Sequence, residues 1–160
     1  DVILIPEIPF SADKVAKVIE KKADAGKAFC IIAIAEGAMT IEESKMKKRE
    51  RLEKRGGDVT ATAALAKHIA EKAGVETRVV VPGHIQRGGS PSAYDRVLST
   101  EFGSFAGRLV KEGRYGVTVA MVNGKVTYNA LADIAGKAKL VPPDAQEVLT
   151  AESIGIYMGR

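Results

Sequence analysis

Short aliphatic runs, separated by stretches with a helical pattern, constrain the fold of this chain more than any other feature of its sequence. Residues 2–5 (VILI) and 28–35 (AFCIIAIA) contain no charged side chain, and residues 76–81 (ETRVVV) end in a run of valines. Such a run is typical of a strand buried on both faces of a parallel sheet, because that strand has no face turned to solvent. The alternation of strands and helices therefore predicts an α/β fold, a mainly parallel, doubly wound sheet flanked by helices.

Local signals place the helices between and after these runs. Ser and Asp are favoured at a helix N-cap, Pro in the first turn, and Gly just past the C-terminus. On these signals we expect helices to begin at Ser11, Asp58, Ser90 and Asp144, and helices to end near Gly26, Gly74 and Gly113.

A β-hairpin is expected late in the chain. Asn123-Gly124 separates the apolar residues 117–122 from residues 125–129. Asn-Gly supplies the two left-handed positions of a type I′ turn, so these segments should pair as antiparallel strands. The hairpin adds an antiparallel element to the mainly parallel sheet.

The composition fits a globular protein and argues against two classes of partner. Hydrophobic residues make up 46% of the chain, and no apolar run is long enough to span a membrane. The formal charge is +4, but acids and bases alternate in residues 42–55, which indicates a solvated helix or a mobile connection. Aromatic residues make up only 5% and Trp is absent, so base stacking is disfavoured. We therefore expect neither a nucleic acid nor a membrane as a partner.

Two features bear on the cellular compartment of the protein and on the extent of the sequence. Cys30 is the only cysteine, so no internal disulfide can form, and we interpret it as an inert core thiol in a cytoplasmic protein. The chain starts at Asp1, directly before a predicted strand, whereas a natural start normally carries Met. We expect the sequence to be a piece of a longer protein.

Polar residues follow each predicted strand. Glu7 comes after the first strand, Glu36 after the second, and the segment 82–91 (PGHIQRGGSP) after the third. The carboxyl ends of parallel strands share one edge of the sheet, where α/β proteins bind ligands. The third segment also combines glycines, a guanidinium and a predicted helix N-terminus, which together bind anions. The sequence therefore predicts a phosphate-bearing ligand at this loop.

Each candidate residue also has a purely structural interpretation. Arg87 could clamp a phosphate with two parallel N–H bonds or pair with Asp95 across the turn, and the residues alone favour neither. A lone histidine such as His84 is more often a structural hydrogen-bonding residue, and Glu36 could pair with a neighbouring base instead of a sugar hydroxyl. Arg78 lies inside an apolar strand and needs an anionic partner, a ligand or an interface. Strand alternation directs Arg78 away from its own loop, toward a subunit boundary.

Several well-known catalytic motifs are absent. The sequence contains neither a G-x-x-x-x-G-K-[ST] loop nor a G-x-G-x-x-G loop. It has no Ser–His–Asp arrangement with a nucleophile elbow and no Cys/His set at metal-ligand spacing. From the residues alone we infer an α/β region that binds an anion or a sugar phosphate.

The longest motif carries a resemblance to a known family. Residues 82–96 (PGHIQRGGSPSAYDR) resemble the signature of the phosphofructokinases, and residues 76–78 (ETR), 34–38 (IAEGA) and 4–7 (LIPE) fit the same family. The resemblance covers residues 1 to about 144 and corresponds to the carboxyl-terminal half of that family. It implies a substrate-binding portion over 1–144, a C-terminal helix and tail over 145–160, and an amino-terminal donor-binding half that is absent from this chain.

The resemblance also implies a reaction and a set of site residues. These enzymes use ATP or pyrophosphate, with Mg²⁺, to phosphorylate the 1-hydroxyl of fructose 6-phosphate in glycolysis. The residues that match the substrate site are Glu36, Arg78, His84, Ile85, Gln86 and Arg87. Of these, Arg78 would reach the substrate phosphate of a neighbouring subunit in a homo-oligomer.

No catalytic residue and no metal ligand is expected in this chain. The donor loop and the catalytic aspartate motif belong to the amino-terminal half, which would bind most of the donor and the Mg²⁺. That half is an implied partner, and the fragment alone should be inactive. The alternative function is a non-catalytic domain that binds or senses a phosphosugar.

Overall fold

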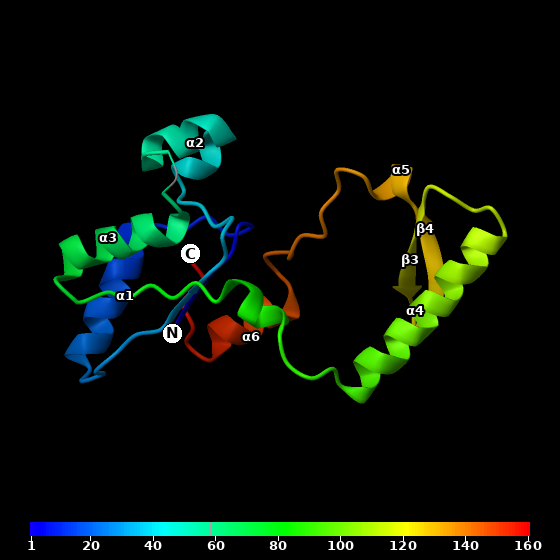
Figure 1. The fold of residues 1–160 in the computed structure, drawn as a ribbon. Helices are drawn as coiled ribbons and strands as arrows, with labels where there is room; N and C mark the ends of the chain where they lie inside the picture. The colour runs from blue at the N-terminus through cyan, green and yellow to red at the C-terminus, as the bar shows by residue number, and fades with distance from the viewer. Residues whose placement is uncertain (58) are drawn as a thin grey trace. The chain divides into compact units, whose positions relative to one another are not determined.

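The computed structural model describes residues 1–57 and 59–160. They form two compact units, Asp1–Val81 with Leu140–Arg160, and Pro82–Lys139, and each is described by itself. The elements, labelled in Figure 1, are β1 (Val2–Leu4), α1 (Ala12–Asp24), β2 (Ile32–Ile34), η1 (Glu43–Lys45), α2 (Lys48–Arg55), α3 (Ala61–Ala73), η2 (Gly83–Arg87), α4 (Ala93–Lys111), β3 (Val117–Val122), β4 (Lys125–Ala130), α5 (Leu131–Ile134) and α6 (Gln146–Ser153). The fold is α/β with a parallel strand pair and an antiparallel hairpin, as predicted, but within the described residues the hairpin forms a sheet of its own instead of adding to the parallel one.

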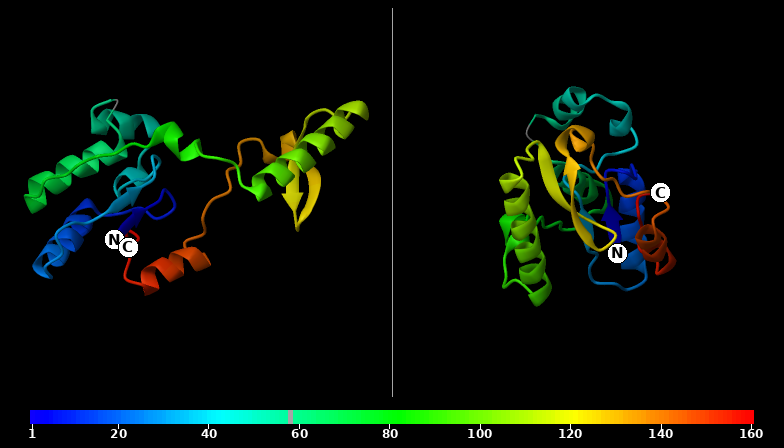
Figure 2. Two further views of the ribbon diagram at one scale, coloured as in Figure 1. Left: turned by 60° about the horizontal axis from the view of Figure 1, so that its bottom comes forward. Right: turned by 90° about the vertical axis from the view of Figure 1, so that its right-hand side faces the viewer.

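The first unit is built on the parallel pair β1–β2. Val2 lies opposite Ile32 and Leu4 opposite Ile34. On the other side of β1, the N–H of Ile3 donates to the carbonyl of Tyr157 over 2.9 Å, so the C-terminal tail lies beside β1. The two termini are therefore neighbours, as the N and C labels show in Figure 2.

Helices cover both faces of this small sheet, in agreement with the unbroken apolar runs. On one face, Val2 and Leu4 pack with four buried residues of α1 and α3, which are Val15, Ile19, Leu65 and Ile69. On the other face, Ile3 and Ile5 pack against a cluster formed by Ile8, Val148 and Met158. Successive residues of β1 point to opposite faces, so both clusters draw on the same short strand.

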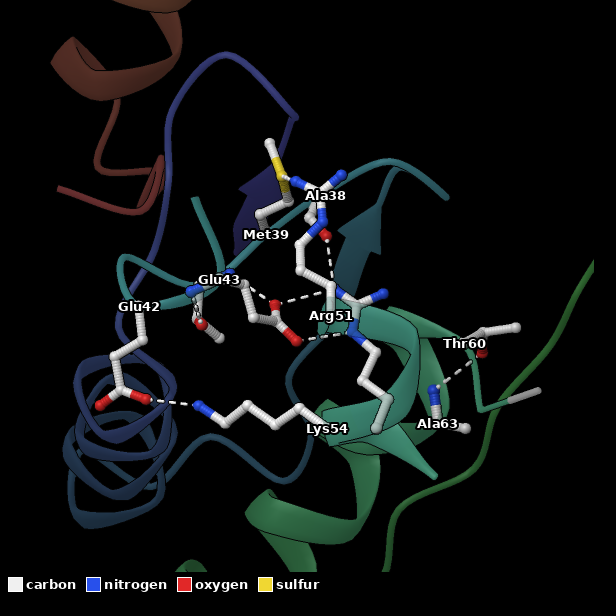
Figure 3. A network of polar contacts seen from close by, with 10 residues as sticks. Ala38, Met39, Glu42, Glu43, Arg51, Lys54, Thr60 and Ala63 are labelled. Atoms are coloured by element: carbon white, nitrogen blue, oxygen red, sulfur yellow. Dashed lines mark hydrogen bonds and ion pairs between the residues drawn. The ribbon is translucent and has the colours of Figure 1, made fainter. Parts of the chain in front are cut away.

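Capping residues account for the starts of the helices in the first unit. The Ser11 hydroxyl accepts a hydrogen bond from the Lys14 N–H over 3.3 Å and caps α1, as predicted. The Thr60 hydroxyl accepts from the Ala63 N–H over 3.2 Å and caps α3 (Figure 3). The predicted cap of this helix, Asp58, lies outside the described residues.

The second unit consists of α4, the β3–β4 hairpin and α5. Asn123 has φ = 50° and Gly124 has φ = 73°, the left-handed pair that a type I′ turn requires, so the hairpin prediction is confirmed. Helix α4 contacts both strands of the hairpin (Figure 1). The chain leaves this helix through Gly113, the predicted terminator, which has φ = 67°.

The third predicted strand is not formed. Residues 76–81 are not assigned to a strand, and Val80 and Val81 are 81% and 79% exposed. A strand exists only as part of a ladder, and the β propensity of three valines does not itself provide a neighbouring strand. Within the described residues no strand pairs with this segment.

Other predicted boundaries also need correction. The second strand is Ile32–Ile34 rather than 28–35, and Phe29 and Cys30 precede it, with Phe29 72% exposed and Cys30 half-buried against the core. Helix α6 begins at Gln146 rather than after Asp144, because a turn from Pro142 to the Ala145 N–H (2.9 Å) comes first.

The charged segment after β2 forms η1 and α2. Helix α2 contains no buried residue, which confirms the interpretation of a solvated helix. In the described part of the chain, no helix combines the length and the apolarity needed to cross a bilayer.

Candidate anion-binding site

The predicted ligand loop folds into the short helix η2, which displays four consecutive candidate side chains. Gly83 enters it with φ = 52°, the Ile85 N–H donates to the Pro82 carbonyl over 3.1 Å, and the Gly88 N–H donates to the Ile85 carbonyl over 3.1 Å. His84, Ile85, Gln86 and Arg87 are all exposed, Ile85 to 82%. An isoleucine so exposed on a tight turn is available to contact a ligand.

Arg87 lies at a pocket in front of the N-terminus of α4. The pocket has a volume of about 440 Å³ and is lined by Arg87, Gly88, Gly89, Ser90, Pro91, Asp95, Arg96 and Ser99. Two guanidinium groups and the positive end of a 19-residue helix therefore border the same space. This combination favours an anion.

Arg87 does not form the ion pair with Asp95 that was its alternative role. The Asp95 carboxylate accepts hydrogen bonds from the Ser92 N–H (2.8 Å) and hydroxyl (2.7 Å), and these bonds hold the pKa of Asp95 below its usual range. This capping box also explains why α4 begins at Ala93 instead of after Ser90. Among residues 1–57 and 59–160, Arg87 makes no ion pair.

Glu36 lies in the turn that follows β2. The Ala35 N–H donates to the Leu4 carbonyl over 2.9 Å, and the Ala38 N–H donates back to the Ala35 carbonyl over 2.9 Å. At Gly37 a Cβ atom would stand 3.1 Å from Pro6 Cγ, so glycine lets this turn lie close to the end of β1. Glu36 is exposed and, in the described part of the chain, pairs with no base.

Arg78 has an anionic partner in its own segment. Its Nε lies 2.8 Å from Glu76 Oε1, and the two side chains are 83% and 76% exposed. Residues two apart lie on the same side of an extended chain, which brings the two groups together. An exposed pair of this kind is worth only about 0–1 kcal/mol, so it does not prevent Arg78 from binding another anion.

The predicted residues thus fall into two groups. His84, Ile85, Gln86 and Arg87 are brought together on η2, which belongs to the second unit, whereas Glu36 and Arg78 belong to the first. Sequence reasoning missed Arg96 and Ser99 as pocket residues. The signal for them was their helical spacing: Ser99 lies three and four positions after Arg96 and Asp95, which places these three pocket residues on one side of the first turns of α4.

The described residues do not fit a metal centre. No group of three or more His, Cys, Asp or Glu side chains in the ranges 1–57 and 59–160 is arranged to hold an ion.

Comparisons with known proteins point to one family over nearly the whole chain. The profile of the family described as Phosphofructokinase matches residues 1–110. The ATP-dependent 6-phosphofructokinase of Spirochaeta thermophila is 43% identical over 167 aligned positions, which cover 99% of this chain and 44% of the relative. The enzyme of the same name from Chloroflexus aggregans is 42% identical over 160 positions, covering 99% and 43%. The chain spans less than half the length of these curated relatives.

Solved structures show the same fold. The pyrophosphate-dependent phosphofructokinase from Nitrosospira multiformis superimposes with a TM-score of 0.64 at 20% identity, covering 96% of this chain and 39% of the other. The phosphofructokinase of Saccharomyces cerevisiae gives a TM-score of 0.57 at 25% identity, covering 83% and 17%. With the family profile matching residues 1–110 of 160, the chain belongs to the phosphofructokinase family.

Proposed function

We propose that this sequence is the fructose 6-phosphate-binding half of a longer 6-phosphofructokinase. The observation that carries the proposal is Arg87, exposed beside the positive end of α4 and free of an ion pair within the described residues. The ATP-dependent 6-phosphofructokinases that match are more than twice as long, which supports a separate half for the donor.

Phosphoryl transfer depends on positioning and on electrostatic stabilisation, and the acceptor half supplies the positioning. Arg87 and His84 bind the 6-phosphate, Ile85 and Gln86 line the sugar site, and Glu36 accepts hydrogen bonds from sugar hydroxyls. ATP or pyrophosphate, with Mg²⁺, binds to the other half. The reaction gives fructose 1,6-bisphosphate, and the enzyme acts in the cytoplasm as a homo-oligomer.

Calorimetric titration of the full-length protein with fructose 6-phosphate tests this function. We expect saturable binding that weakens as salt is added, because the site is cationic. The 160-residue chain alone should bind weakly and show no transferase activity. Binding by the full-length protein without turnover in the presence of donor and Mg²⁺ would identify the alternative, a non-catalytic phosphosugar-binding domain. An absence of binding would refute both.

Arg78 is proposed to complete the site of a neighbouring subunit. Arg78→Ala should weaken fructose 6-phosphate binding in the full-length protein, while Glu76→Ala, which removes only its present partner, should not. Hybrid oligomers of the Arg78→Ala variant with a second inactive variant should regain activity, because some sites then receive intact residues from both chains. Well-mixed hybrids that stay inactive would count against a shared site.

A further inference from the structure

The turn that contains Glu36 is followed by residues 38–41, which are held against the core. Ala38 is 0% exposed, the Phe10 N–H donates to the Met39 carbonyl over 3.0 Å, and the Ile41 N–H donates to the Phe10 carbonyl over 2.9 Å. These contacts fix the segment downstream of the turn. Glu36 itself lies in the exposed turn between Ala35 and Ala38.

A bidentate ion pair lies directly beside this peptide. Arg55, the last residue of α2, places Nε 2.6 Å from Glu43 Oε1 and Nη2 2.7 Å from Glu43 Oε2. The same Nη2 donates to the Ala38 carbonyl over 3.2 Å. The side chains of Arg55 and Glu43 are only 12% and 8% exposed. The dashed lines from Glu43 and Ala38 in Figure 3 mark these contacts.

Glu43 also forms two hydrogen bonds with Thr40, in the segment that follows the turn. Its Oε2 accepts from the Thr40 N–H over 2.9 Å, and the Thr40 hydroxyl accepts from the Glu43 N–H over 3.2 Å. The hydrogen bond from Arg55 is the main reason why the pKa of Glu43 lies below its usual range. Burial acts in the opposite direction, and the hydrogen bond from the Thr40 N–H lowers the pKa further. The carboxylate is therefore ionised at neutral pH and keeps its ion pair with Arg55. We call this ion pair, together with the bond from Arg55 to the Ala38 carbonyl, the clamp.

We propose that Arg55 and Glu43 are positioning residues for the substrate site, which hold the Ala38 peptide and thereby orient Glu36 toward the sugar. The inference rests on the proposed function, because it assigns Glu36 to substrate binding. It gives the charged segment a specific role, since α2 brings the largely covered guanidinium of Arg55 to the Ala38 peptide. Neither residue touches the substrate.

The neighbouring ion pair provides a matched control. Lys54 Nζ lies 2.6 Å from Glu42 Oε2, between residues that directly precede Arg55 and Glu43 in the sequence. Figure 3 shows this pair apart from the Ala38 peptide. These two side chains are 46% and 76% exposed. Both pairs join α2 to the same segment, but only the Arg55 pair contacts the peptide next to the Glu36 turn.

The test is a mutant cycle in the full-length enzyme. Arg55→Ala should raise the KM for fructose 6-phosphate about tenfold and leave the KM for the phosphoryl donor unchanged, a size typical of residues coupled through a backbone shift. Lys54→Ala should change neither KM by more than about twofold, as expected for an exposed pair. In a Glu36→Gln background, Arg55→Ala should have almost no further effect on the KM, because it acts through Glu36. Arg55→Lys should restore part of the affinity, since it keeps the charge but loses the fork.

The possible outcomes separate the two proposals. If Arg55→Ala raises both KM values equally, or adds its full factor in the Glu36→Gln background, the positioning role is refuted. If Glu36→Gln alone leaves the KM unchanged, the proposed function of Glu36 fails. The clamp is then judged by hydrogen exchange of the Ala38 and Thr40 amides, which donate to Ala35 and Glu43 and should exchange faster in Arg55→Ala but not in Lys54→Ala. Equal exchange in both would refute the clamp, and Arg55→Lys replaces Arg55→Ala if that variant does not fold.

Discussion

Arg87→Ala in the full-length protein is expected to weaken binding of fructose 6-phosphate by about 2–4 kcal/mol, or about 30- to 1,000-fold in KM. The guanidinium borders a pocket together with Arg96 and the N-terminus of α4, and no carboxylate of the described residues pairs with it. Removing it therefore takes away a charged donor and leaves the phosphate partly unpaired. Steady-state kinetics with fructose 6-phosphate as the varied substrate measure the effect.

Two variants sharpen this experiment. Arg87→Lys keeps the charge but not the planar fork, so its KM should lie between those of the native protein and Arg87→Ala. Lys125→Ala removes an exposed cation that does not line the pocket, and should change the KM by less than about twofold. An unchanged KM in Arg87→Ala would rule out the assignment of this loop to the acceptor phosphate.

The elements that could be predicted from the sequence are those whose signals are local. The Ser11 cap, the Asn123-Gly124 turn and the terminator Gly113 each act within a few residues of the backbone they shape. Their stabilising contacts are complete without distant partners, so pattern and structure agree.

The elements that sequence reasoning placed wrongly depend on competition or on distant partners. Residues 76–81 have the composition of a strand, but pairing requires a neighbouring strand that local propensity does not specify. Ser90 and Ser92 are both acceptable caps, and Ser92 is used because Asp95 stands three residues after it and completes a capping box.

The same distinction applies to the candidate site. Residues 84–87 are contiguous, so one helical turn presents them together once the loop is recognised. Glu43 and Arg55 are separated by 12 positions within a stretch of alternating charges, and nothing local distinguishes them from the exposed pair Glu42–Lys54. Only the position of the C-terminal end of α2 beside Ala38 and Glu43 selects one pair for burial.

Phe10→Ala is expected to destabilise the first unit by about 3–5 kcal/mol, the range for removing a buried phenyl ring. Phe10 is 2% exposed and packs in the cluster shared by β1, α1 and α3. Its backbone bonds to Met39 and Ile41 keep the main chain in place, so the cavity cannot close by local collapse. Hydrogen exchange of the α1 amides as a function of urea measures the free energy of opening of this unit.

Phe29→Ala is the matched control, because it removes the same ring from the same unit at a position that is 72% exposed. Its effect should stay within about 0.5 kcal/mol, as for surface substitutions in general. Equal destabilisation by the two substitutions would mean that the core around β1 is not where the stability of this unit resides.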